Sequence, residues 1–188
     1  MIDADPSFDR FDPLSLTPDA FEQLVASTLQ KQGVGLKEFA VRHLEPVIGL
    51  DGGYTIDVTA RFEALGGDFL VLIECKQQQR AVERDVVQVL HDKVRSVGAQ
   101  KGMLFSTSGF QRGALEYARL HGIALVRVAD GRTSYETRSL EPIRSYPSWI
   151  PRYVGWLTQL TADGDESRAY LGEVDIATLR DAFEAHTV

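Results

Sequence analysis

The chain has 188 residues, 44% of them hydrophobic and 25% charged, which is typical of a soluble globular protein with one α/β core and a short appendage. No apolar stretch is long enough to cross a bilayer, and the acidic start lacks the order of a signal peptide. A single cysteine excludes an internal disulfide, so we expect a cytoplasmic protein with no membrane contact. The net charge of −7 argues against a protein that coats nucleic acid by bulk electrostatics, so any such contact has to be local.

The first half of the chain reads as one helix followed by three strands. After an N-terminal extension over residues 1–16, Thr17 and Pro18 are typical of the N-cap and first position of a helix that runs to about Lys31. Gly33 then ends the helix. Segments rich in β-branched and aromatic residues follow, separated by glycine-rich turns, and they predict strands over residues 39–48, 54–64 and 69–76.

The second half alternates helices and strands. Amphipathic spacing predicts helices over residues 82–97 and 110–121, and short apolar runs predict strands over residues 102–107 and 123–128. Continuous apolar strands joined by helices indicate a parallel part of the sheet. Residues 17–131 therefore read as an α/β core of the order α-β-β-β-α-β-α-β, with a mixed central sheet. For residues 132–188 we expect a C-terminal extension of short helices packed on the core, the last over residues 175–185.

Charged residues end the most apolar strand of the chain. Side chains two apart on a strand share a face, so Glu74 and Lys76 project together while Cys75 points the other way. Burying an ionised group is costly unless the group is paired or bound to a metal, although a strand that runs out into solvent would explain the tripeptide by itself. Asp57 lies near one end of the preceding strand, and an antiparallel hairpin would bring it to the same end of the sheet as Glu74.

In this order, these residues resemble the Mrr-type restriction endonuclease domain of the PD-(D/E)xK nuclease superfamily. The resemblance spans residues 21–130 and implies a restriction-endonuclease-like, three-layer fold. The motifs that carry it are Phe21-Glu22-Gln23-Leu24-Val25, Asp51-Gly52-Gly53, Ile56-Asp57-Val58, Glu74-Cys75-Lys76, the segment from Gly102 to Phe110, and Glu116-Tyr117-Ala118.

The chain departs from the family pattern in two respects. The family often has a compact Asp-Gly-Gly-Ile-Asp run, whereas Tyr54 and Thr55 intervene here, so Asp51 remains an alternative to the preferred Asp57 as metal ligand. Many Mrr-type proteins also carry a separate winged-helix module, and the segment before Phe21 is too short to be one. Target choice would then depend on this chain's own loops, its C-terminal segment or a separate specificity subunit.

The resemblance implies a Mg²⁺-dependent endonuclease that hydrolyses phosphodiester bonds of DNA, with Mn²⁺ able to replace Mg²⁺. Asp57 and Glu74 supply carboxylate oxygens of the kind that Mg²⁺ prefers, and the backbone carbonyl of Cys75 is a further candidate ligand. Lys76 would orient the attacking water and offset negative charge in the transition state. Glu22 is placed where related nucleases have an auxiliary acid, although a glutamate favoured by the helix dipole is an equally ordinary explanation.

Other polar residues are weaker candidates. Residues that follow the strand could contact the DNA backbone, or form an ordinary polar loop; they are Gln77, Gln78 and Arg80. The hydroxyls of Ser106, Thr107 and Ser108 precede a predicted helix and could bind phosphate, but a simple N-cap is the preferred interpretation. The four histidines have no metal-ligand spacing, so neither zinc chemistry nor a histidine base is indicated.

A different class of function also fits the sequence. A nuclease-fold module that no longer cuts, and instead binds DNA or a protein partner, would agree with the acidic composition. The retention of Asp57, Glu74 and Lys76 together argues against it. A cluster of Trp149, Tyr153 and Trp156 could cover the core or form the surface of a homodimer.

Overall fold

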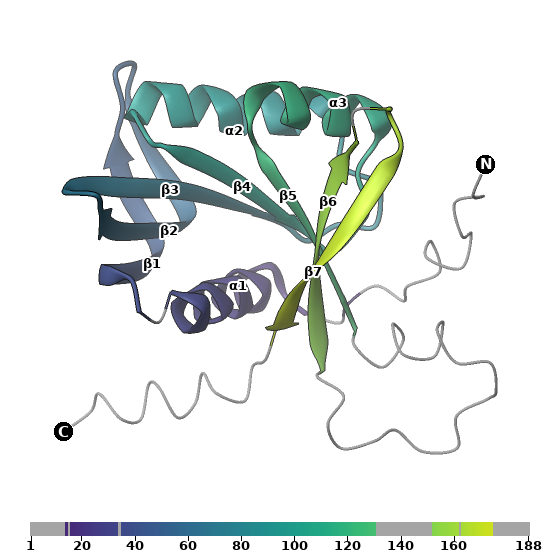
Figure 1. Cartoon of the computed structure of the whole chain (residues 1–188), viewed down its shortest axis with the longest axis horizontal. Helices are drawn as coiled ribbons and strands as arrows, with labels where there is room; N and C mark the ends of the chain where they lie inside the picture. Colours follow the sequence, from purple (N-terminus) through teal and green to yellow (C-terminus); the bar gives the residue numbers. More distant parts are fainter. Residues whose placement is uncertain (1–13, 15, 34, 131–151, 162, 175–188) are drawn as a thin grey trace.

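The structure is a computed structural model that describes residues 14, 16–33, 35–130, 152–161 and 163–174. A twisted sheet lies between helix α1 on one face and helices α2 and α3 on the other, so the described part has three layers (Figure 1). This confirms the predicted α/β class with a mixed central sheet. The elements in chain order are α1 (Pro18–Gln32), β1 (Lys37–Ile48), β2 (Gly53–Ala64), β3 (Gly67–Lys76), α2 (Arg84–Val97), β4 (Lys101–Ser106), α3 (Arg112–His121), β5 (Ala124–Asp130), β6 (Tyr153–Leu160) and β7 (Glu166–Val174).

The seven strands lie in the sheet in the same order as in the sequence. Strands β1, β2 and β3 form an antiparallel meander, as the glycine-rich turns predict. Strand β4 then pairs in parallel with β3, and β5 pairs in parallel with β4, because helices α2 and α3 carry the chain back over the sheet. Strands β6 and β7 return to antiparallel pairing. The first half of β2 therefore lies beside the end of β3.

Helix ends follow the local sequence signals. The side chain of Thr17 accepts a hydrogen bond from the backbone N–H of Ala20 at 3.2 Å, with Pro18 in the first turn, as expected for a capped N-terminus. Gly98 and Gly122 follow α2 and α3 in the left-handed conformation, with φ of 73° and 67°. This conformation favours glycine and ends each helix next to the strand that follows.

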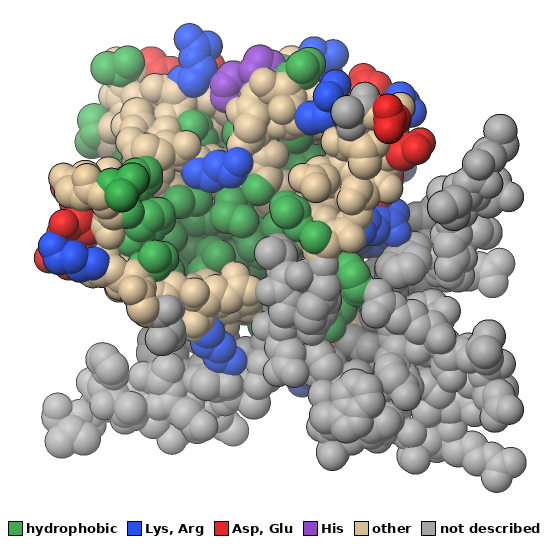
Figure 2. Space-filling view, in the orientation of Figure 1, with side chains coloured by type: hydrophobic (Ala, Val, Ile, Leu, Met, Phe, Trp, Pro, Cys, Tyr) green, Lys and Arg blue, Asp and Glu red, His purple; other side chains and the backbone are tan. Residues whose placement is uncertain are grey.

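Two apolar cores hold the layers together. Helix α1 packs through Phe21, Leu24 and Val25 on one face of the sheet. Helices α2 and α3 pack on the other face, where Leu90 and Leu115 are almost fully buried. Hydrophobic surface is visible in the middle of the molecule, in a hollow below the α2 and α3 layer (Figure 2). Apolar side chains on the α1 face that remain only partly buried include Val71 on β3, Met103 on β4 and Leu157 on β6.

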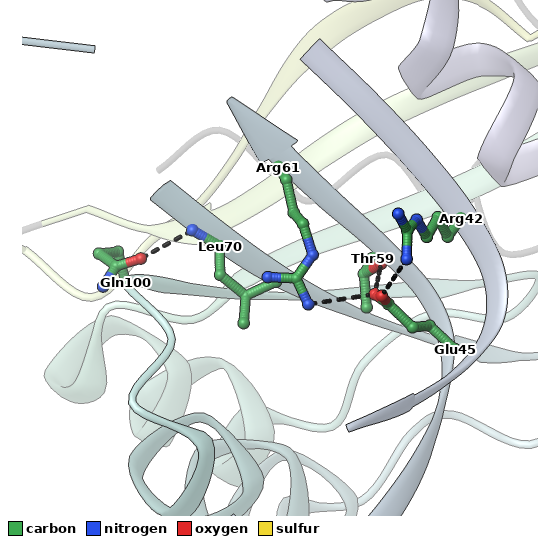
Figure 3. Close-up of polar contacts among 6 residues, drawn as sticks. All are labelled: Arg42, Glu45, Thr59, Arg61, Leu70 and Gln100. Atoms are coloured by element: carbon green, nitrogen blue, oxygen red, sulfur yellow. Dashed lines mark hydrogen bonds and ion pairs between the residues drawn. The ribbon is translucent and has the colours of Figure 1, made fainter. Parts of the chain in front are cut away.

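A partly buried carboxylate joins the first two strands. Glu45 on β1 accepts hydrogen bonds from Thr59 and from Arg61 on β2, the latter at 3.3 Å, and pairs with Arg42 at 3.0 Å (Figure 3). On the other side of the meander, the N–H of Leu70 donates to the side chain of Gln100 at 2.7 Å (Figure 3). The contacts of Glu45 join β1 to β2, and the contact of Gln100 joins β3 to the segment before β4.

The prediction of short helices after residue 131 is wrong for residues 153–174. This segment forms β6 and β7, which extend the sheet from β5. Tyr153 and Trp156 are buried in β6, which agrees with the first of the two alternatives, that they cover the core. Trp149 and the helix expected over residues 175–185 lie outside the described residues.

Candidate metal and phosphodiester site

Asp57 lies where the ladder between β2 and β3 ends. The last paired residues are Val58 on β2 and Ile73 on β3. Beyond them, the backbone N–H of Cys75 donates a hydrogen bond to Oδ2 of Asp57 at 2.8 Å. A side-chain carboxylate thus takes the place of a backbone acceptor. The contact holds Asp57 against the peptide that joins Glu74 to Cys75.

The carbonyl of Cys75 points to the same side of β3. In an extended strand, the N–H and C=O of one residue face the same neighbouring strand. Because the Cys75 N–H is directed at Asp57, its carbonyl oxygen is directed to that side as well. Its thiol points into the core beside α1. Burial raises the pKa of this thiol well above its usual value, and the carboxylates of Asp57, Glu22 and Glu74 raise it further.

Glu74 and Lys76 project together from β3, as the strand geometry predicts. Oε2 of Glu74 lies 3.6 Å from Nζ of Lys76. The Glu74 side chain is only 8% exposed, whereas that of Lys76 is 37% exposed and reaches solvent. The structure therefore brings Asp57, Glu74, Cys75 and Lys76 together at the C-terminal end of β3.

A second lysine reaches the same carboxylate. Nζ of Lys93, on α2, forms an ion pair with Oε1 of Glu74, and the Lys93 side chain is 19% exposed. Lys93 was not among the predicted site residues. Its position on a helix, some twenty residues after Glu74, gives no local signal, since only the packing of α2 on the sheet shows which helix face meets β3.

Glu22 does not pair with the other predicted site residues. Its Oε2 lies 2.7 Å from Nε2 of His43 on β1. Ligand atoms of Asp19, Glu22 and His43 lie within 4.8 Å of one another. The spacing of the histidines in the sequence does not indicate this cluster, because His43 meets two acidic residues that are distant in the chain. Helical periodicity explains the acidic pair, since positions three apart share a helix face.

Asp51 is engaged elsewhere. Its carboxylate accepts hydrogen bonds from Ser96 and, at 2.7 Å, from the hydroxyl of Tyr54. These hydrogen bonds lower the pKa of Asp51. The β1–β2 turn is thereby fixed to the last turn of α2, on the side of the sheet where β2 begins. Asp57, rather than Asp51, is the aspartate that contacts the Glu74-Cys75 peptide.

The predicted polar loop after β3 is held by hydrogen bonds to other parts of the chain. The amide of Gln77 donates to the carbonyl of Leu16 at 2.6 Å. Gln78 and Thr107 exchange two hydrogen bonds, each 3.0 Å long, and Ser108 donates to the carbonyl of Arg80 at 2.7 Å. The loop after β3 is therefore joined to the loop after β4.

The N-cap interpretation of the three hydroxyl residues is wrong. Helix α3 begins at Arg112 with Gln111 as its N-cap, several residues after Ser108. Ser106 and Ser108 are instead buried, with their hydroxyls 3.0 Å apart. They stabilise the two loops that frame the site.

A cavity of about 510 Å³ adjoins this loop and the start of α2. The exposed side chain of Arg80 is its single basic lining residue, beside the acidic Glu83 and Asp85. The two carboxylates make the cavity as a whole unfavourable for a phosphate. Among the residues that line the cavity, only Arg80 offers the positive charge that a phosphate backbone requires.

The donors at this edge of the sheet suit a hard divalent cation. Asp57 and Glu74 contribute carboxylate oxygens and Cys75 contributes a carbonyl, which are the ligand types found at magnesium sites. Neither zinc-type thiolate ligation nor a histidine is needed, since the Cys75 thiol points away into the core.

The mixed sheet between helical layers carries an aspartate, a glutamate and a lysine where the pairing of β2 with β3 stops, as the resemblance to the PD-(D/E)xK nuclease superfamily implies. The family model described as "Restriction endonuclease" (Mrr_cat) matches residues 13–131. The chain belongs to this family. Its membership makes it a nuclease-superfamily protein.

Other comparisons are less informative. The chain is similar to the protein in "Crystal Structure of Protein of Unknown Function AF1548", with 21% identity and a TM-score of 0.45. The similarity covers 55% of this chain and 54% of that one, so the chain spans about half the length of this relative. No curated protein matches. Among the described residues, no helix is long and apolar enough to cross a membrane.

Proposed function

We propose that this protein is a metal-dependent endonuclease that hydrolyses phosphodiester bonds of DNA, of the Mrr-like restriction or repair type. Mg²⁺ is the proposed cofactor, and Mn²⁺ can replace it. The observation that supports the proposal most strongly is the hydrogen bond from the Cys75 N–H to Asp57, since it sets a second carboxylate beside Glu74 and Lys76.

Each side chain has a definite task in this proposal. A bound divalent cation would supply the positive charge that offsets charge building on the phosphoryl oxygens. Asp57 and Glu74 hold that cation, together with the Cys75 carbonyl. Lys76, at the exposed rim, donates hydrogen bonds that orient the attacking water and stabilise the transition state. Glu22, fixed by His43, is the auxiliary acid on the α1 side.

DNA would approach from the solvent side of Lys76. Arg80 is exposed in the loop that follows β3, so it is the proposed contact to the DNA backbone. The net charge of −7 gives little general attraction for DNA, and binding would depend on such local contacts and on the cation.

A plasmid nicking assay tests this function. Supercoiled DNA, methylated and unmethylated, is incubated with the protein and Mg²⁺ or Mn²⁺, with a chelator as control. We expect nicking that the chelator abolishes. Removal of a group that stabilises the transition state typically costs about 10²-fold or more in rate, so Asp57→Asn, Glu74→Gln and Lys76→Met should each lose most activity.

Matched variants make the result specific. Asp57→Asn keeps an oxygen that can accept the Cys75 N–H, so it removes charge with little change in structure. Asp51→Asn removes an equivalent charge at the alternative aspartate and should cleave like the parent. Equal cleavage by Lys76→Met and the parent would refute the enzymatic proposal. DNA binding without cleavage on every substrate would favour the non-cleaving module instead.

A further inference from the structure

Glu74 is held by ammonium groups at both of its oxygens. Lys93 pairs with Oε1, and Nζ of Lys76 lies 3.6 Å from Oε2. The Glu74 side chain is 8% exposed, and that of Lys93 is 19% exposed. Solvent therefore screens this pair much less than an ordinary surface ion pair.

Two lysines offset the charge of the two proposed carboxylate ligands without any added ion. Asp57 and Glu74 contribute two negative charges, and Lys76 and Lys93 contribute two positive charges. A buried carboxylate needs such compensation, since leaving it unpaired is strongly destabilising. The positive charge that pairs with Oε1 belongs to Lys93 on α2. This helix lies in a different layer of the molecule from the strand that carries Glu74.

A divalent cation and the Lys93 ammonium compete for the same oxygen of Glu74. Both require the lone pairs of the carboxylate, and two positive charges within a few ångströms of each other repel strongly where water is scarce. If Glu74 ligates a cation, the Lys93 ammonium has to leave Oε1 or tolerate this repulsion. Lys76 differs, because it is more exposed and lies at the longer distance.

We propose that Lys93 is a positioning residue that holds Glu74 in place before a divalent cation binds and competes with the cation for that carboxylate. Lys93 thereby sets the concentration of cation that the site requires. This inference rests on the proposed function, since it takes Glu74 as a ligand.

Calorimetric titration of the full chain with Mn²⁺, and in parallel with Mg²⁺, tests the inference without reference to cleavage. Lys93→Met keeps the length of the side chain and removes its charge, so Mn²⁺ should bind about tenfold more tightly, as expected when a nearby like charge is removed. Lys93→Arg keeps the charge and should bind Mn²⁺ like the parent. A purely structural role for Lys93 would instead weaken binding in both variants.

Lys101→Met is the matched control for net charge. Lys101 is exposed at the start of β4 and donates to the carbonyl of Gly122, so its loss changes the charge of the whole chain equally, away from Glu74. It should leave the Mn²⁺ affinity unchanged. Should Lys93→Met fail to fold, as judged by circular dichroism, Lys93→Gln takes its place under the same criterion.

The outcomes separate the two proposals. Tighter Mn²⁺ binding by the Lys93→Met variant, but not by Lys101→Met, supports competition. Unchanged or weaker binding by Lys93→Met, with binding lost in Asp57→Asn, overturns the role of Lys93 and leaves the metal site intact. If the parent protein binds neither ion, the metal-dependent function and the inference both fail.

Discussion

Asp57 and Glu74 contribute to the site in different ways. Asp57 is partly buried, and a backbone donor fixes one of its oxygens. Glu74 is more deeply buried and is neutralised by lysines. The alternation of side chains along a strand was sufficient to predict that Glu74 and Lys76 share a face. Lys93 and His43 could not be predicted, because both contacts depend on packing between layers.

Glu45 should make the stability of the protein depend on pH. Burial raises the pKa of Glu45, but the hydrogen bond from Thr59 and the charges of Arg61 and Arg42 lower it by more, so the net shift is downward from 4.5. The folded state therefore favours the ionised form. This contribution is fully present above the unfolded pKa and is lost as the pH falls through the lower, folded value.

Glu45→Gln tests this dependence. The variant should be less stable than the parent at pH 7, and the difference should shrink as the pH is lowered below about 4.5, where the carboxylate becomes protonated. Urea unfolding at pH 7 and at several acidic pH values measures both free energies of unfolding. A difference that stays constant over this range would contradict the assignment.

At the scale of elements, the close approach of α2 to β4 determines where Lys93 lies. A Cβ added to Gly102 on β4 would lie 2.8 Å from Cδ1 of Ile123 and 2.9 Å from Cγ2 of Val94. Val94 is the neighbour of Lys93 on α2, and Leu90 lies one turn before it. Glycine at this position thus lets the helix approach closely enough for Lys93 to reach Glu74.

Gly102→Ala should destabilise the protein by about 1–3 kcal/mol, as is typical when a packed core receives an extra methyl group. Chemical denaturation measures the change. Gly67→Ala is the control, since a Cβ there meets only the carbonyl of Ala64 at 3.8 Å, in ordinary contact. Equal stability of the two variants would show that α2 adjusts at no cost.

The elements of the core were predictable to within a few residues because their signals are local. Thr17, Gly98 and Gly122 mark helix ends, and apolar periodicity marks the segments between them. Strand β6 was missed although Tyr153, Val154 and Trp156 favour strands. The aromatic residues were interpreted as a cluster that covers the core or forms a dimer surface, since nothing local shows that β5 has an open edge to extend.

At the scale of the whole molecule, β6 and β7 are part of the central sheet and cover the edge of β5. Five residues of β5 are buried, and four of them are apolar, namely Leu125, Val126, Val128 and Ala129. A chain truncated after residue 131 would leave β5 as an exposed edge strand with these apolar faces partly uncovered. Such an edge promotes pairing with other chains.

We therefore expect the chain truncated after residue 131 to aggregate or to elute as larger species in size-exclusion chromatography. A chain that ends after residue 174 keeps all seven strands and should elute close to the parent. Recovery of the shorter chain in a soluble form, with the parent's thermal transition, would show that residues 17–131 fold independently.

The agreement between strand order in the sheet and strand order in the sequence also bears on biosynthesis. Each strand finds its partner among residues that have already left the ribosome, so none has to be inserted later between two earlier strands. The meander of β1, β2 and β3, which brings Asp57 to Glu74, can form before α2 is synthesised. The acidic residues would then meet in the nascent chain before Lys93 exists to neutralise them.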